Sequence, residues 1–221
     1  INNTAIGTSS LFSNTTGVQN TAVGQNSLQN NTIGYYNTAI GQVALFSNTT
    51  GVQNTAVGVG TLYGNTTGIN NTAVGTNSLL SNTIGTQNTA VGASALNANT
   101  IGTQNTAVGV SALYNNTTGA NNTAVGLNAG STVTTGSNLT IIGNNAQPSS
   151  ATVSNEITLG NGSVTALRVP GVGFSVASDG SAVFTNMQFA GKNAIINGGM
   201  DIWQRGTSFA AAGYTADRWK V

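Results

Sequence analysis

The sequence predicts an all-β protein whose main part is a parallel β-solenoid, a coil of short strands stacked along one axis. Three observations lead to this prediction. A block reading NTAVG or NTAIG recurs every seventeen residues, glycines recur in phase with it, and the repeated part contains no charged residue. Self-similarity at a short fixed period is typical of repeat architectures, in which each unit contacts only its neighbours.

The period holds without a slip through ten copies. The blocks begin at Asn3, Asn20, Asn37, Asn54, Asn71, Asn88, Asn105 and Asn122, and the spacing continues to Leu139 and Glu156. Seventeen residues are too few for a helical hairpin, and Gly, Asn and Thr are poor helix formers. Short strands broken by glycine fit a solenoid whose coils stack about 4.8 Å apart, so ten coils would make a rod of about 48 Å.

Each unit offers few large apolar side chains. We expect the valine of the block and a leucine five residues later to form the core, with Ala22 and Ile33 as further candidates in the coil that begins at Asn20. The predicted core residues are Val23, Leu28, Val57, Leu62, Val74, Leu79, Val91, Leu96, Val108 and Leu113. Glycines at the corners would permit a positive φ or a close approach of backbone. The predicted corner glycines are Gly24, Gly41, Gly58, Gly75, Gly92, Gly109 and Gly126.

All nine charged residues lie in the last part of the chain, from Glu156 onward. In a register-true stack every side chain would lie beside its own copy, and a repeated charge would cost about 0.9 kcal/mol per contact even in water. Asparagine can instead form hydrogen-bonded ladders along such a stack. We expect one ladder at the block starts and a second one at Asn14, Asn31, Asn48, Asn65, Asn82, Asn99 and Asn116.

A solenoid with so few core side chains is underfilled as a lone column. In the TAVG strand, Thr and Val share one face and Ala and Gly the other, and neither face has the polar character of an ordinary solvent-facing surface. One face could line the core of the coil while the small face packs against another chain. We therefore expect lateral association, and a parallel homotrimer in particular.

Composition excludes several classes of function. A net charge of +1 without a basic patch disfavours nucleic-acid binding, and no apolar run approaches the length that crosses a bilayer. The shaft lacks His, Cys, Asp, Glu and Lys through residue 155, so we expect no enzyme, no cofactor and no metal site. The many Asn-x-Thr tripeptides follow from the repeat itself and predict nothing about glycosylation.

The pattern NTAVGxxALxxNTTGxxNTAVG resembles the repeats common in phage tail fibres and related trimeric surface fibres. It is also similar to the head repeats of trimeric autotransporter adhesins, whose SVAIG-like blocks build a left-handed parallel β-roll. The resemblance covers residues 1 to about 160 and implies a structural, adhesive role. The seventeen-residue period is longer than that of the adhesin repeats. A two-sided roll, a three-sided β-helix and an intertwined trimer therefore remain open.

Beyond the repeat we expect a β connector at 161–190, because apolar and polar residues alternate there between Gly and Asp-Gly turns. The segment 191–221 resembles the start of a jelly-roll-like, sugar-binding domain near the ends of phage tail fibres, and we expect the natural protein to continue past its last residue. Trp203, Arg205 and Trp219 are weak ligand candidates in this segment, although core packing and ion pairing explain them as well.

Three functions are compatible with the sequence. The first is the shaft of a trimeric phage tail fibre in the virion, which contacts other tail proteins and holds a tip that binds a host surface glycan or receptor. The second is a bacterial surface adhesin stalk. The third is an ice-binding solenoid, which the threonine column at the second position of every block suggests, although that column is single.

Overall fold

The computed structural model describes residues 2–169, 174–177 and 182–184. The chain divides into two units, Ile1–Thr165 and Ala166–Val221. Within the described residues the regular structure is entirely β, as the sequence predicts. The strands of the first unit are β1 (Thr4–Ile6), β2 (Thr21–Val23), β3 (Thr38–Ile40), β4 (Thr55–Val57), β5 (Thr72–Val74), β6 (Thr89–Val91), β7 (Thr106–Val108), β8 (Thr123–Val125), β9 (Thr140–Ile142) and β10 (Ile157–Leu159).

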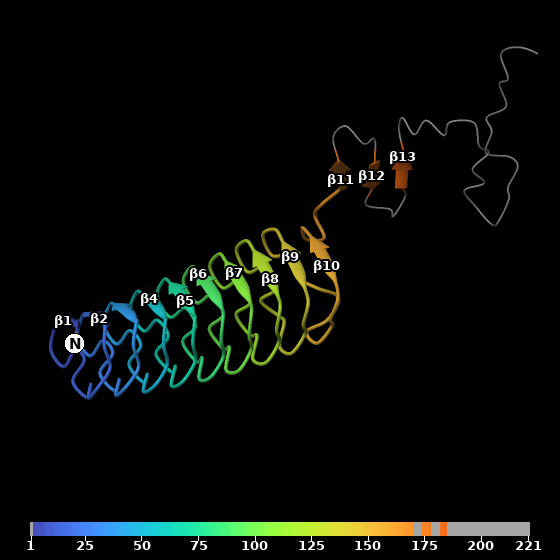
Figure 1. Ribbon diagram of the computed structural model, residues 1–221. Helices are drawn as coiled ribbons and strands as arrows, with labels where there is room; N and C mark the ends of the chain where they lie inside the picture. The colour runs from blue at the N-terminus through green and yellow to red at the C-terminus, as the bar shows by residue number, and fades with distance from the viewer. Residues whose placement is uncertain (1, 170–173, 178–181, 185–221) are drawn as a thin grey trace, which may run out of the picture. The chain divides into compact units, whose positions relative to one another are not determined.

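Each strand of the first unit pairs in parallel with the strand one coil further along the chain, so the ten strands form one sheet along the solenoid (Figure 1). Thr55 lies opposite Thr72 and Ala56 opposite Ala73, and the seventeen-residue offset holds from β1 to β10. The predicted parallel β-solenoid is confirmed. Because the paired strands belong to one chain, the solenoid closes within that chain rather than being woven from several.

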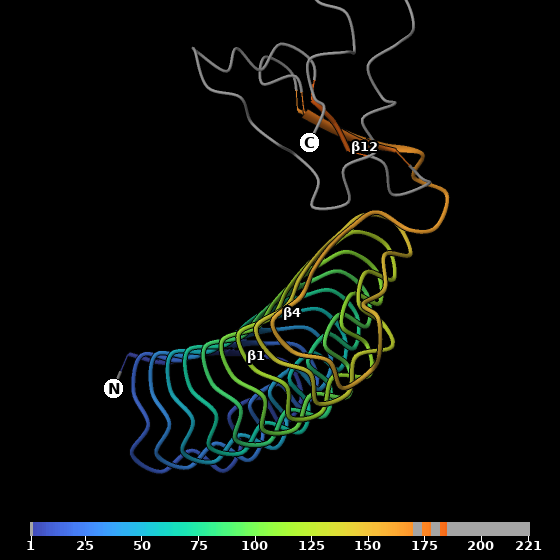
Figure 2. The ribbon, with the colours of Figure 1, turned by 90° about the vertical axis from the view of Figure 1, so that its right-hand side faces the viewer.

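Only three residues of each coil are strand, and turns form the rest of the loop, as the stacked coils in Figure 2 show. The sheet is therefore one wall and the turns are the other, instead of the three strand faces of a triangular β-helix. Three residues per coil adopt the left-handed conformation, for example Asn77 (φ 56°), Leu79 (φ 49°) and Gln87 (φ 59°). This conformation is uncommon for leucine, and the chain repeats it in seven coils.

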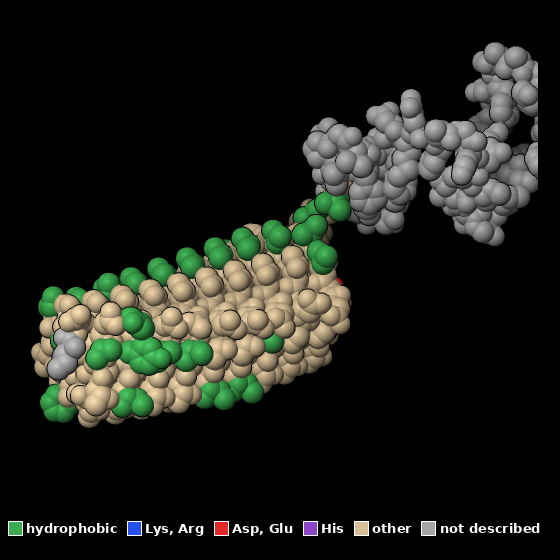
Figure 3. Space-filling model, in the orientation of Figure 1, with side chains coloured by type: hydrophobic (Ala, Val, Ile, Leu, Met, Phe, Trp, Pro, Cys, Tyr) green, Lys and Arg blue, Asp and Glu red, His purple; other side chains and the backbone are tan. Residues whose placement is uncertain are grey.

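The predicted valine core is wrong, because the valines point outward and the alanines point inward. Ala73 is fully buried, whereas Val74 is 38% exposed, and Val91 and Val108 have the same exposure. Val23 and Val57 are half-buried. A long row of apolar side chains is visible on the outside of the solenoid (Figure 3). The prediction for Ile33 is wrong as well, because this side chain is 52% exposed and does not belong to the core.

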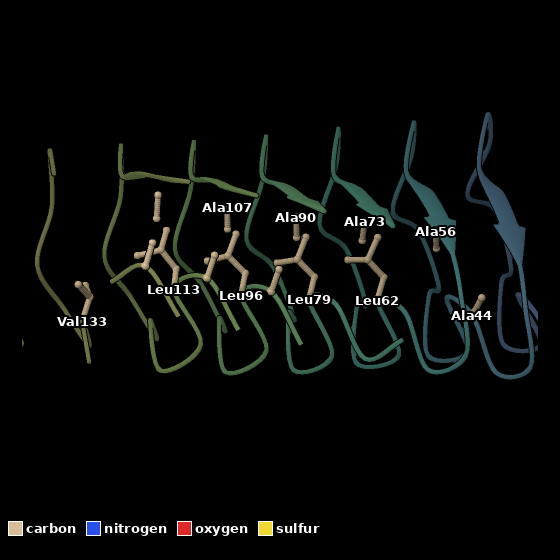
Figure 4. Packing of buried hydrophobic residues seen from close by; sticks show 14 of the residues in the cluster. Ala44, Ala56, Leu62, Ala73, Leu79, Ala90, Leu96, Ala107, Leu113 and Val133 are labelled. Atoms are coloured by element: carbon tan, nitrogen blue, oxygen red, sulfur yellow. The ribbon is translucent and has the colours of Figure 1, made fainter. Parts of the chain in front are cut away.

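The core is filled by leucines that rise from the turn wall against the alanines of the strand wall (Figure 4). The predicted leucines are all fully buried: Leu28, Leu62, Leu79, Leu96 and Leu113. Because the two walls are close, a leucine on one side leaves room only for a methyl group on the other. This explains why alanine and not valine faces inward.

The eighth and ninth coils show this fit in reverse. Gly130 stands in the leucine column, and Ile141 stands in the alanine column. A Cβ atom added to Gly130 would lie 2.8 Å from Cδ1 of Ile141 and 3.1 Å from Cδ2 of Leu113. The isoleucine therefore fills the space that the leucine occupies elsewhere, and the two columns share one core volume.

Two buried ladders of asparagine run through the coils, as predicted. In the second column, Nδ2 of Asn82 donates to Oδ1 of Asn65 at 2.8 Å and to the carbonyl oxygen of Gly85 at 3.1 Å. In the first column, Nδ2 of Asn71 donates to the same Gly85 oxygen at 2.8 Å, and Oδ1 of Asn71 accepts from the backbone N–H of Asn88 at 3.0 Å. Both ladders thus converge on one carbonyl group in each coil.

The corner glycines are required by geometry, as expected. Gly75 has a φ of 128°, and a Cβ there would lie 2.6 Å from the carbonyl carbon of Gly92. The second glycine of each coil is required by close approach alone, since a Cβ on Gly85 would overlap Oδ1 of Asn82.

The described part of the second unit contains three short antiparallel strands, within the segment predicted to be a β connector. They are β11 (Ala166–Val169), β12 (Phe174–Ala177) and β13 (Ala182–Phe184), in the order β11-β12-β13. The segment 191–221, predicted to begin a further domain, lies outside the described residues.

Candidate functional site

The strongest surface feature of the solenoid is an unbroken apolar column on the outside of the strand wall, which we name the strand ridge. It consists of Ile6, Val23, Ile40, Val57, Val74, Val91, Val108, Val125, Ile142 and Leu159. Val23 and Val57 are half-buried. The other members are exposed, from 38% at Val74 to 60% at Ile6. Every strand of the ten contributes one member, because each strand ends on this position. Successive members therefore lie one coil spacing apart, about 4.8 Å.

A column of threonines runs beside the ridge on the same face. Strands β1 to β9 begin with a threonine, which is half-buried at Thr55 and Thr89 and exposed at Thr72. The inward-pointing residue follows it and the ridge residue comes next. Since alternate residues of a strand share a face, the strand wall presents threonine and valine together to the outside. This face contains neither charge nor strongly polar groups other than hydroxyls.

Two further columns flank the ridge, one on each side along the coil. The upstream flank lies five residues before the ridge and contains Val18, Tyr35, Val52, Ile69, Thr86, Thr103, Ala120 and Ser137. The downstream flank lies two residues after the ridge and contains Thr8, Gln25, Gln42, Val59, Thr76, Ala93, Val110 and Leu127. The upstream flank is apolar in the first four coils, and the downstream flank is apolar mainly in the later ones.

Aromatic side chains on the solenoid occur as local pairs. The rings of Phe46 and Tyr63 stack in parallel with centroids 5.1 Å apart, and those of Tyr35 and Tyr36 meet edge to face at 5.3 Å. Because they do not continue from coil to coil, these pairs do not form a ladder along the solenoid.

The chemistry available for catalysis or for metal binding is sparse. Within residues 2–169, 174–177 and 182–184 no three His, Cys, Asp or Glu side chains come together as metal ligands. The described residues form no helix long and apolar enough to span a bilayer. The weak ligand candidates Trp203, Arg205 and Trp219 lie outside the described residues.

Glu156 is the one carboxylate in the repeat, at the block-start position two coils after the last asparagine of the first column, Asn122. Its pKa is lowered, chiefly by the hydroxyl of Ser149 and also by the Ser149 backbone N–H, which donates to Oε1 at 2.9 Å. The hydroxyl of Thr158 donates to Oε1 at 3.0 Å and lowers the pKa further. The role of this carboxylate is to accept hydrogen bonds in the last coil.

Sequence reasoning placed the valines in the core and so missed the ridge as a surface. The eighth and ninth repeats contain a signal that could have revealed it. There the leucine becomes Gly130 and the alanine becomes Ile141. Such an exchange indicates that these two columns face each other, and the valine must then point outward. No family model, curated protein or solved structure was found to match this chain.

Proposed function

We propose that this chain is the shaft of a homotrimeric fibre that holds a receptor-binding tip away from a virion, as part of a phage tail fibre. The observation that carries the proposal is the strand ridge, an outward apolar column on a solenoid with no charged residue before Glu156. The resemblance of the repeat to tail-fibre sequences adds the biological setting. The role is passive, since the shaft contributes length and rigidity and the tip would contact a host glycan or receptor.

An exposed ridge of this length supports association between chains. Isolated surface valines are ordinary, but continuous apolar surface marks an interaction site. Burying one valine, isoleucine or leucine side chain contributes up to about 1.5–3 kcal/mol when it was fully exposed, and the ridge offers ten partly exposed ones. Closed cyclic symmetry with the solenoids running in the same direction would bring three ridges to a common axis.

The interior supports a structural role as well. Fully buried asparagines are costly unless their donors and acceptors are paired, and here successive coils pair them along the column as far as Asn116. A stack of this kind resists salt and pH because its interactions involve no ionised groups. These properties suit a shaft that must keep its length outside the cell.

The test is the mass of the intact chain in solution, measured by light scattering after size exclusion. A trimer of the 22.0 kDa chain would have a mass of about 66 kDa and elute as an elongated particle. A folded monomer at micromolar concentration would overturn the proposal.

A matched pair of variants links the mass to the ridge. Val74→Lys places a charge on the ridge, whereas Thr67→Lys places one at an exposed position seven residues earlier, outside the ridge. We expect the first variant to shift the protein towards monomer, because a lysine buried at the axis would be desolvated and close to its own copies. The second variant should remain trimeric.

One observation favours a second candidate, the ice-binding solenoid. The threonine column and the ridge both face outward on the same strand wall, so two regular columns and not one are presented to solvent. This function requires the face to be free of a partner chain. A monomer that produces thermal hysteresis would support it, and loss of the hysteresis in Thr72→Lys would locate the surface.

A bacterial adhesin stalk would use the same trimeric solenoid. It differs from a phage fibre in its attachment to a cell rather than to a virion. Detection of the intact protein in purified virions would distinguish the two.

A further inference from the structure

We infer that the partner of this surface is a second copy of the chain, and that the copies are inclined to one another and wind around a common axis. The inference rests on the proposed function, because it specifies how the shafts associate. Its basis is the unequal distribution of apolar residues on the two flanks of the strand ridge.

The upstream flank is apolar only at its N-terminal end. Val18, Tyr35, Val52 and Ile69 occupy its first four positions, and from Thr86 onward the column contains threonine, alanine and serine. Figure 3 shows apolar side chains gathered towards the N-terminal end of the visible face, below the long row. In the first four coils the apolar surface therefore extends from the ridge to the upstream side.

The downstream flank has the opposite distribution. Its first three positions are Thr8, Gln25 and Gln42. In the later coils Val110 and Leu127 are 48% and 47% exposed, which makes the apolar surface extend from the ridge to the downstream side. Val59, which is 46% exposed, lies in the part of the solenoid where the apolar surface passes from the upstream to the downstream flank.

Together the two flanks and the ridge form a band that crosses the solenoid obliquely. We name it the oblique band; its members are Val18, Tyr35, Val52, Ile69, the strand ridge, Val59, Val110 and Leu127. A partner that covers the band must follow the band and not the solenoid axis. If both partners are the same chain, each solenoid axis is inclined to their common axis, so the chains cross or wind.

Three properties of the band favour a copy of this chain as its occupant. Residues 1–155 contain no charge, so a charged partner would gain no ion pair. The side chains recur once per coil, about 4.8 Å apart, and a second copy presents the same spacing. The band is also long, because nine coil spacings of about 4.8 Å give about 43 Å of apolar surface that a second solenoid can follow.

The absence of cysteine from the chain allows a direct test by single-cysteine variants. A disulfide between two copies of the same residue requires Cα atoms within about 7 Å, so it forms only near the symmetry axis. Val52→Cys and Gln42→Cys probe the upstream and downstream flanks of one early coil. In the later part of the solenoid, Thr103→Cys probes the upstream flank and Val110→Cys, seven residues further on, probes the downstream flank.

Under mild oxidation of the full chain, we expect disulfide-linked dimers in denaturing gels for Val52→Cys and Val110→Cys, at least fivefold more than for Gln42→Cys and Thr103→Cys. Tyr35→Cys and Leu127→Cys provide a second pair of variants if one of the first pair does not fold. Val74→Cys, on the ridge in the middle of the solenoid, should also form linked dimers.

The remaining outcomes are each decisive. If the chain is trimeric and only ridge positions such as Val74→Cys are linked, the solenoids run straight and the inference is wrong, while the proposed function stands. If a trimer shows equal linkage, or no linkage, at all four flank positions, the inference is likewise wrong and the proposed function stands. If light scattering shows a monomer, the proposed function fails and the inference fails with it.

Discussion

Val133 stands one coil beyond Asn116, at the position from which an asparagine would donate to Oδ1 of Asn116. Each earlier rung of this ladder receives such a bond, for example Oδ1 of Asn99 from Nδ2 of Asn116 at 2.9 Å. Oδ1 of Asn116 is the one buried side-chain polar atom without a partner in the part of the chain that the structure describes. The ladder thus ends on an unpaired acceptor, where Val133 of the eighth coil replaces the next asparagine.

The position of a rung in the ladder should decide how much it contributes. Asn82→Ala removes the donor to Oδ1 of Asn65 and the acceptor of Nδ2 of Asn99, so it creates a new unpaired acceptor. Asn116→Ala only moves the unpaired acceptor from Asn116 to Asn99. We expect the first variant to be less stable than the second by about 1–3 kcal/mol, measured by chemical denaturation. Equal losses would mean that the interior bonds contribute no more than packing.

The exchanged residues Gly130 of the eighth coil and Ile141 of the ninth predict strong energetic coupling. Ile141→Ala alone leaves a cavity and should cost about 2–5 kcal/mol. Gly130→Leu alone should also destabilise, because its Cβ would lie 2.8 Å from Cδ1 of Ile141. The double variant restores the leucine–alanine pair of the other coils. A double-mutant cycle should therefore give a favourable coupling energy of at least about 1 kcal/mol, whereas additive effects would contradict the shared core volume.

Val43 is a β-branched residue in the left-handed conformation, with a φ of 52°. The same column holds asparagine at Asn26, Asn77 and Asn128, and asparagine tolerates this conformation better. Val43→Asn should raise the free energy of unfolding by about 1 kcal/mol. Val110→Asn is the control, since Val110 has no positive φ, and it should bring no such gain in the stability of the chain.

The pH dependence of the last coil should follow Glu156. Hydrogen bonds from Ser149 and Thr158 lower the pKa of its carboxyl group from 4.5, so the folded state favours the ionised form. Stabilisation is therefore present above about pH 4.5 and is lost as the pH falls through the lowered pKa of the folded state. Amide exchange of Ser149 should accelerate over that range.

Glu156→Gln serves as the control for this titration. The amide cannot ionise, so exchange at Ser149 should become independent of pH after correction for intrinsic rates. Residues 1–155 contain no carboxylate, and their amides should show no comparable transition. A transition that persists in Glu156→Gln would assign the effect to another group.

Periodicity was sufficient to predict most of the fold. The seventeen-residue period predicts the parallel register, the corner glycines and the asparagine ladders, because each of them depends only on the stacking of equal coils. The buried leucines follow from the same pattern. The homotrimer and the further domain at 191–221 stay predictions, because the fold of the described residues tests neither.

The candidate site was harder to predict, since alternation separates two faces of a strand without saying which one is inside. By size the valine, for example Val91, is the expected core residue, but the side chain on the opposite wall decides which face is inside. Leu79 reaches across from a left-handed turn and leaves space only for Ala90 on the strand wall (Figure 4). A leucine with a φ of 49° is rarely formed, so sequence propensity gives no indication of this turn.

Both asparagine columns converge on one glycine carbonyl in each coil, so the length of the solenoid can change only by whole coils. Removing the seventeen residues 71–87 would join Asn70 to Asn88 and leave every kind of contact in place. Removing sixteen or eighteen would shift each later amide away from its acceptor. Duplication or loss of single coils is therefore a simple evolutionary route by which such a shaft can change its reach, in increments of about 4.8 Å.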